Sequence, residues 1–156
     1  METDVVSKEQ IELATFFVGN ALCGIDILQV QEINKLMEMT EVPQAPEYVN
    51  GILNLRGQII TVIDLGKKLG LGQTEINADS RNIIVNGLGE HIGMFVKQIS
   101  DVATVNPQYV EPAPANMKGI QGEFFTGVYK TEETLVGILN VAKILKFDQD
   151  HSSTNG

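Results

Sequence analysis

The sequence predicts a mainly β fold of two small barrel subdomains with short helices, one of them at the C-terminal end. The chain of 156 residues holds 15 valines and 16 isoleucines against 13 leucines and 8 alanines, and such β-branched side chains favour strands. Its 15 glycines supply turns between short apolar stretches. The order of these stretches in the first half recurs in the second, which indicates an internal duplication.

Apolar stretches bounded by turn residues predict the strands of the first half. They span residues 13–18, 22–27, 30–36, 52–55 and 58–63. Gly19-Asn20 separates the first two stretches, which predicts a β-hairpin. Asp64 stands where the N-cap of a short basic helix over 65–69 would lie, and Gly70 is placed to end that helix.

The second half repeats this arrangement after a polar, glycine-containing stretch over 70–80. Its predicted strands span residues 82–85, 92–96, 99–105, 124–129 and 134–139. Asn86-Gly87 is the strongest two-residue hairpin signal in the chain. A proline-rich loop over 107–114 follows the third of these strands. A C-terminal helix over 141–147 is predicted to begin after Asn140, its N-cap.

Individual residues recur at two constant spacings between the halves. At the shorter spacing, Gly24, Val30, Glu32 and Ile33 are matched by Gly93, Ile99, Asp101 and Val102. At the longer spacing, Gly51, Ile63 and Asp64 are matched by Gly127, Leu139 and Asn140. We therefore expect one domain over 12–147, with subdomains over about 12–78 and 79–147 and mobile tails at 1–11 and 148–156. Closed barrels would remove exposed edge strands; one larger sandwich is the alternative.

Composition and charge exclude several function classes. The formal net charge is −9, and the 11 lysines and arginines are scattered along the chain, so we expect no binding to nucleic acid. The one cysteine excludes an intramolecular disulfide and indicates a reducing cytoplasm. No apolar run is long enough for a membrane span, and residues 1–10 are polar and acidic, unlike a secretory signal. We therefore expect no direct insertion into a membrane.

The sequence contains no recognisable catalytic motif. Signatures of hydrolases, metalloproteases, phosphate-binding loops and dinucleotide-binding folds are all missing from it. His91 and His151 are the only histidines, and neither has an evident partner for catalysis or metal binding. Cys23 lies in an apolar stretch without a neighbouring base, as an inert packed thiol would. We therefore expect no enzymatic activity, no metal and no cofactor.

Two groups of residues suit contact with other molecules. Arg56 lies at a turn in an apolar neighbourhood, so its guanidinium must either pair with an acid or a carbonyl, with Glu32 and Asp64 as the candidate acids, or reach outward to a partner. The segment Leu36-Met37-Glu38-Met39 carries two unbranched thioethers, which would form an adaptable exposed surface or fill the core. The sequence leaves both alternatives open.

Several segments carry a resemblance to a known family. In the first half they are residues 24–27, 30–33, 49–57 and 61–65, and in the second half 92–96, 100–102, 112–114 and 138–145. The block Asn54-Leu55-Arg56-Gly57, followed by Asp64-Leu65, is the most specific part. Over about residues 12–147, the chain resembles the CheW family of chemotaxis coupling proteins.

This resemblance implies two five-stranded SH3-like barrels packed together. It also implies a non-enzymatic adaptor that joins the cytoplasmic tips of chemoreceptors to the regulatory domain of the histidine kinase CheA, in the cytoplasm at membrane receptor arrays. By matching position, the receptor-contact residues would be Val30, Glu32, Gly51, Asn54, Leu55 and Arg56. The kinase-contact residues would be Val110, Glu111, Pro112, Ala113 and Pro114, with Leu36, Met37 and Met39 as further candidates.

Two positions depart from the family pattern. Ile60 stands where a proline is usual, which would leave an edge strand more regular, and Lys97 stands where an acid is usual, which changes the charge of that surface. Two other functions stay open. One is the same adaptor in a receptor–kinase circuit for surface motility or development, and the other is a double barrel that binds a small ligand.

Overall fold

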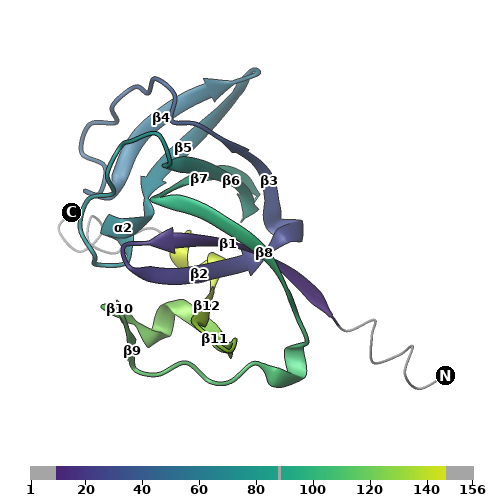
Figure 1. The fold of residues 1–156 in the computed structure, drawn as a ribbon. Coiled ribbons are helices and arrows are strands. Elements are labelled where there is room, and N and C mark those ends of the chain that lie inside the picture. The colour runs from purple at the N-terminus through teal and green to yellow at the C-terminus, as the bar shows by residue number, and fades with distance from the viewer. Residues whose placement is uncertain (1–9, 88, 147–156) are drawn as a thin grey trace.

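Two five-stranded β-sheets make up most of the structure (Figure 1). The computed structural model describes residues 10–87 and 89–146. In sheet A the order is β11 (Phe125–Lys130), β12 (Leu135–Leu139), β2 (Ala21–Asp26), β1 (Ile11–Val18) and β8 (Gln98–Val105). In sheet B the order is β3 (Val30–Asn34), β6 (Arg81–Gly87), β7 (Glu90–Val96), β5 (Gln58–Asp64) and β4 (Val49–Leu55). The predicted mainly β fold with two five-stranded units is confirmed.

The other elements are short. They are β9 (Asn116–Met117) and β10 (Ile120–Gln121), the helices α2 (Leu65–Lys68) and α3 (Val141–Ile144), and the 3-10 turns η1 (Ile27–Gln29), η2 (Pro107–Tyr109) and η3 (Gly122–Phe124). The segments predicted as mobile tails lie outside the described residues, except that β1 already begins at Ile11.

Both sheets curl. In each sheet the segment that follows one edge strand comes back to pair with the opposite edge strand, and we call this the returning segment. After β3 the chain comes back to the opposite edge of sheet B, where Thr40 bridges Ile52 of β4 through two backbone hydrogen bonds of 2.8 Å. After β8, Glu111 bridges Val128 of β11 in the same way, again with two bonds of 2.8 Å. Each bridge pairs edge groups that an open sheet would leave free.

The two sheets do not coincide with the two predicted subdomains, because each sheet contains strands from both halves of the chain. The division at residue 78 would keep β1 and β2 with β3, β4 and β5, yet β1 pairs with β8 and β2 pairs with β12. Figure 1 shows β1 and β2 beside β8 and apart from β4 and β5. The chain passes from one sheet to the other twice, at η1 and at Lys97 between β7 and β8. The first hairpin of the first half, β1 and β2, therefore lies in sheet A with the later strands of the second half. The first hairpin of the second half, β6 and β7, lies in sheet B with the later strands of the first half.

The duplication itself is visible in the strand register. β2 and β12 are parallel, with Gly24 opposite Ile138, and β7 and β5 are parallel, with Gly93 opposite Val62. These two pairs are related by the two constant spacings found in the sequence, the shorter from Gly24 to Gly93 and the longer from Val62 to Ile138. The repeat therefore extends to which residues lie opposite each other in neighbouring strands, as well as to the residue types.

Several local predictions can be compared with the structure. Asp64 and Asn140 accept hydrogen bonds from the backbone N–H groups of Lys67 and Lys143, so both predicted N-caps are confirmed. The hairpin predicted at Asn86-Gly87 is confirmed, since β6 and β7 pair antiparallel, but the predicted turn position is wrong because both residues continue β6 and pair with His91 and Glu90. The expectation of a more regular edge strand at Ile60 is also wrong, because β5 is not an edge strand and lies between β7 and β4.

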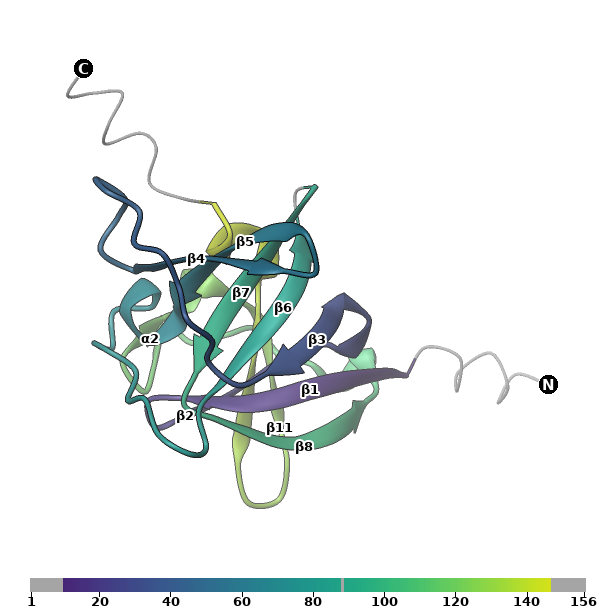
Figure 2. The same cartoon turned by 90° about the horizontal axis from the view of Figure 1, so that it is seen from above.

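The apolar core has three parts in the described chain. The largest joins the two sheets and includes Phe16 and Ile25 of sheet A with Ile63 and Met94 of sheet B. A second lies within sheet B and consists of Leu53, Ile60, Val62, Ile84 and Phe95. A third lies within sheet A and consists of Leu13, Val105 and Val136. Because the largest part belongs to both sheets, the sheets stabilise one another. Figure 2 shows β1 and β8 crossing beneath the strands of sheet B.

Candidate functional site

A tight turn presents Arg56 at the outer end of sheet B. β4 and β5 are joined through Arg56 and Gly57, with Leu55 paired to Gln58. Both turn residues have positive φ, 52° and 85°, the combination that a type I′ hairpin turn requires. The side chain of Asn54 accepts a hydrogen bond of 3.0 Å from the N–H of Gly57 and braces the turn. Arginine is strained in this conformation, so the turn holds it at a conformational cost.

Arg56 and Glu32 form an ion pair across the two outer strands of the sheet. The guanidinium donates to Oε1 of Glu32, which comes from β3, whereas Arg56 follows β4. The Arg56 side chain is 71% exposed and the Glu32 side chain 27%. The structure therefore combines both alternatives that the sequence left open for Arg56, since it pairs with an acid and also faces outward.

Asn34 holds the second oxygen of the same carboxylate. Its Nδ2 donates to Oε2 of Glu32 at 3.0 Å. Hydrogen bonds from Asn34 and from Arg56 lower the pKa of Glu32, and the positive charge of Arg56 adds to this effect. The sequence analysis missed Asn34, although its position two residues after Glu32 places it on the same face of a strand.

The other predicted receptor-contact residues differ in exposure. Val30 is half-buried beside the core shared by the sheets, and Leu55 is half-buried against the core of sheet B. Gly51 is buried, and a Cβ atom there would lie 2.7 Å from the carbonyl oxygen of Thr40. Gly51 thus makes room for the returning segment. Ile59, which the sequence analysis did not single out, is opposite Asn54 and 62% exposed.

The predicted kinase-contact segment is held against sheet A. Glu111 forms the bridge to β11, and the side chain of Val110 packs on the core of that sheet. Ala113 packs on the shared core. Pro112, which lies between Glu111 and Ala113, and Pro114, which follows Ala113, are both exposed. The segment therefore presents two prolines and an acid on a fixed backbone.

The second group of kinase-contact candidates is divided between core and surface. Leu36 and Met39 pack against the core of sheet B, whereas the side chain of Met37 is 38% exposed. Both alternatives considered for this segment therefore occur, core filling for Met39 and an exposed thioether for Met37.

Groups that would suggest catalysis are not assembled in the described residues. Burial raises the pKa of the Cys23 thiol to about 12, so this thiol stays protonated and unreactive. Across residues 10–87 and 89–146, no cluster of three or more His, Cys, Asp or Glu side chains could hold a metal ion. No helix in these residues is long and apolar enough to span a membrane.

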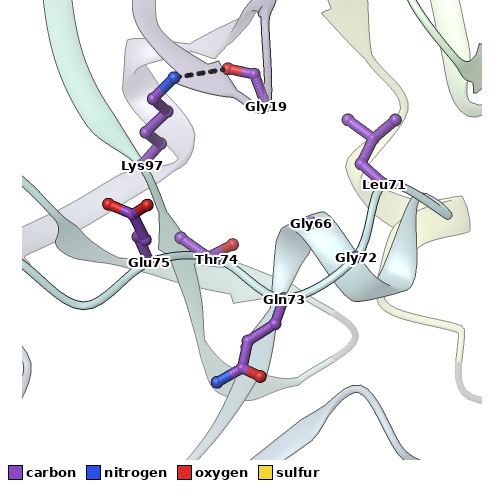
Figure 3. Close-up of a pocket in the computed structure, with 8 residues that line it drawn as sticks. All are labelled: Gly19, Gly66, Leu71, Gly72, Gln73, Thr74, Glu75 and Lys97. Carbon is purple, nitrogen blue, oxygen red and sulfur yellow. Dashed lines mark hydrogen bonds between the residues drawn. The ribbon is translucent and has the colours of Figure 1, made fainter.

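Two hollows flank the turn between β1 and β2. One has a volume of about 170 Å³, and Lys97 lies at its edge, where its ammonium donates to the carbonyl of Gly19 at 3.4 Å (Figure 3). The other has a volume of about 200 Å³ and includes Met117 and Glu133. Small-molecule sites usually have volumes of about 300–1,000 Å³. Neither hollow reaches that size.

Comparison with known proteins agrees with these observations. The family model described as a CheW-like domain matches residues 12–149. Chemotaxis protein CheW of Treponema pallidum is 33% identical over 143 residues, covering 89% of this chain and 84% of that protein. Chemotaxis protein CheW of Bacillus subtilis is 30% identical over 142 residues, covering 91% of each. The crystal structure of the scaffolding protein TtCheW from Thermoanaerobacter tengcongensis matches with a TM-score of 0.81 and 34% identity, covering 88% of this chain and 89% of that one. The chain therefore belongs to the CheW-like domain family.

Proposed function

We propose that this protein is a non-enzymatic adaptor of bacterial chemotaxis that couples chemoreceptors to a CheA-type histidine kinase. Relatives named as chemotaxis protein CheW, and the similar scaffolding protein TtCheW, support the role. The observation that carries the proposal is the exposed Arg56, which a strained turn and an ion pair with Glu32 hold in place. We expect the protein in the cytoplasm, at arrays of membrane receptors.

The receptor surface lies at the outer end of sheet B. Arg56 and Asn54 are exposed there, Val30 and Leu55 contribute half-buried apolar side chains, and Ile59 adds an exposed one. An apolar centre with an arginine at its rim is typical of protein interfaces. This surface suits the helical hairpin of a chemoreceptor tip.

The kinase surface lies on sheet A. The segment from Val110 to Pro114 is anchored by the bridge of Glu111 to Val128 and exposes its two prolines. It belongs to a different sheet from Arg56, so both partners could bind at once. Simultaneous binding raises the effective concentration of each partner for the other. Coupling further requires contacts that differ between the active and inactive states of the kinase.

Charge reversal at Arg56 tests the receptor surface. The variant Arg56→Glu should bind a purified receptor-tip fragment about tenfold or more weakly, as loss of an interface arginine commonly does. It should still bind the kinase regulatory domain and melt close to the wild-type temperature, because exposed ion pairs contribute little to stability. Lys130→Glu, the same charge change on sheet A, is the matched control and should bind the receptor normally. Normal receptor binding by Arg56→Glu would contradict the proposal.

Two other functions are distinguished by simple measurements. A ligand-binding double barrel would show a raised melting temperature with a tight small molecule, but the two hollows described above are small for such a ligand. An adaptor in a circuit for surface motility or development would have the same surfaces. Co-sedimentation with receptor-bearing membranes and a CheA-type kinase identifies the circuit through the partners that bind.

A further inference from the structure

Two asparagine side chains lie opposite each other inside sheet B. Asn34 of β3 is directly opposite Asn82 of β6 in the antiparallel register. Asn82 is 0% exposed. Nδ2 and Oδ1 of Asn82, together with Oδ1 of Asn34, are buried and have no hydrogen-bond partner in the part of the chain that is described.

These atoms are chemically complementary. An Asn Nδ2 donates hydrogen bonds and an Asn Oδ1 accepts them. Side chains directly opposite in an antiparallel pair have their Cβ atoms about 4.5–5.5 Å apart, and the terminal torsion of asparagine turns over a broad range. Rotation about this torsion can bring the Nδ2 of Asn82 toward Oδ1 of Asn34, and the free-energy cost of an unpaired buried amide favours that hydrogen bond.

The duplicated half of the protein shows that the fold does not require amides here. The equivalent pair in sheet A is Leu13 opposite Ala103, because the shorter spacing of the repeat relates Leu13 to Asn82 and Asn34 to Ala103. Leu13 is fully buried in the core of that sheet. The polar pair thus occurs in the sheet that carries the ion pair of Glu32 with Arg56, and an apolar pair occupies the same place in the other sheet.

The amide of Asn34 connects this buried pair with the surface. Its Nδ2 donates to Glu32, whose other oxygen accepts from Arg56. We propose that Asn34 and Asn82 are positioning residues for receptor contact: Asn82 donates to Oδ1 of Asn34 and so fixes the amide that holds the Glu32 carboxylate beneath Arg56. This inference rests on the proposed adaptor function.

The orientation of Asn34 is the physical reason for the effect. If its amide turned over, Oδ1 would face the carboxylate of Glu32 and repel it. A donor from Asn82 selects the orientation in which Nδ2 faces Glu32. The sheet interior thereby sets the position of an exposed arginine that Asn82 does not itself contact.

The variant Asn82→Leu tests this by copying Leu13 at the equivalent position. Leucine is close to asparagine in shape and adds apolar contact, which offsets the donor that Oδ1 of Asn34 loses, so the variant should melt close to the wild-type temperature. In NMR titrations of the free protein, the pKa of Glu32 should rise, because Asn34 is no longer held as a donor. Affinity for a purified receptor-tip fragment should fall about three- to tenfold, the effect of one hydrogen bond. An unchanged Glu32 pKa together with unchanged affinity in this folded variant would overturn the proposal.

A second variant tests the proposal if Asn82→Leu alone does not fold properly. The double change Asn34→Ala with Asn82→Leu installs the whole apolar pair of sheet A and should raise the pKa of Glu32 as well. Asn86→Leu, on the exposed part of β6, is the control and should leave the pKa of Glu32 and the affinity unchanged. The Glu32 titration needs no receptor. If Arg56→Glu binds the receptor normally while Asn82→Leu still raises the pKa of Glu32, the proposed function fails and the positioning pair stands.

Discussion

The hairpin from β4 to β5 in sheet B and the hairpin from β11 to β12 in sheet A occupy equivalent places but present opposite charges. Leu55 and Gln58 flank the two-residue turn of Arg56 and Gly57. In sheet A, Thr131 and Thr134 flank Glu132 and Glu133, and the N–H of Thr131 donates to the carbonyl of Thr134 at 2.8 Å. The longer spacing of the repeat, which relates Gly51 to Gly127, places Glu132 at the position of Arg56.

The acids at equivalent positions of the repeat also differ in their surroundings. Glu32 pairs with Arg56 in sheet B, whereas its counterpart in sheet A is Asp101, whose sheet carries Glu132 in place of an arginine. The backbone plan of the duplication is thus retained, while the side chains at this end have diverged. Features shared by both halves should therefore matter for folding, and features present in one half should matter for contact.

The largest expected effect comes from a feature that both halves share. A Cβ atom on Gly51 would lie 2.7 Å from the Thr40 carbonyl oxygen, and one on Gly127 would lie 2.8 Å from the Glu111 carbonyl oxygen. Gly51→Val and Gly127→Val should each lower the free energy of unfolding by about 2–3 kcal/mol, because the returning segment must move away. Urea denaturation measures both values.

Gly70→Ala is the control for those two variants. Gly70 has a φ of 84° and no atom within 4 Å of a Cβ position, so only backbone strain of about 1–2 kcal/mol is expected. If only one of the two valine variants is destabilised beyond this control, the returning segments are not equivalent and the comparison between halves fails.

The helix caps should show an intermediate and unequal effect. Asp64 is buried and accepts three hydrogen bonds, from Lys67 N–H and from the N–H and hydroxyl of Thr74. Asn140 accepts one, from Lys143 N–H. Asp64→Ala should cost about 2 kcal/mol, since it also leaves the buried donors of Thr74 unpaired. Asn140→Ala should cost about 1 kcal/mol. Thermal unfolding measures both losses of stability. Equal losses would show that the hydrogen bonds from Thr74 to Asp64 add nothing to stability.

The smallest effect concerns how the stability contributed by the ion pair of Glu32 with Arg56 changes at low pH. The pKa of Glu32 is lowered from its ordinary value of 4.5 by hydrogen bonds from Asn34 and Arg56. A lowered pKa in the folded state adds stability above pH 4.5 that is lost as the pH falls through the folded value. The stability difference between wild type and Glu32→Gln should therefore narrow below that pH. Asp101→Asn is the matched control, because its sheet has no arginine to pair with. A difference that stays constant with pH would contradict the ion-pair interpretation.

Local features could be predicted from the sequence because they depend on neighbouring residues. Apolar stretches located the strands, and Asp64 and Asn140 marked both helix starts correctly. The exchange of hairpins could not be predicted, because both halves carry the same strand pattern and either sheet could accept either hairpin. The turn expected at Asn86-Gly87 failed because pairing with β7 continues through both residues.

The candidate site was predictable only in part. The resemblance pointed to Arg56 and Glu32, and the curl of sheet B brings them together from opposite edges. No sequence pattern indicated that Gly51 is buried, because its role depends on Thr40 returning to β4. The burial of Asn82 was also missed. In the sequence it is a polar residue that begins an apolar stretch, and such a residue is expected at the exposed end of a strand rather than in the interior of a sheet. Whether the predicted contact residues bind a receptor or a kinase stays a prediction.

The exchange of hairpins also bears on how such a chain could have arisen. A half-length chain with this pattern carries three strands and a helix for one sheet and a hairpin for another, so it cannot complete a sheet by itself. Two copies could complete each other by swapping their hairpins around a two-fold axis. Fusion of those copies would give the present connections, with one crossing at η1 and one at Lys97. The single chain thus has the strand exchange of a domain-swapped dimer within one polypeptide, and its two halves can carry different side chains.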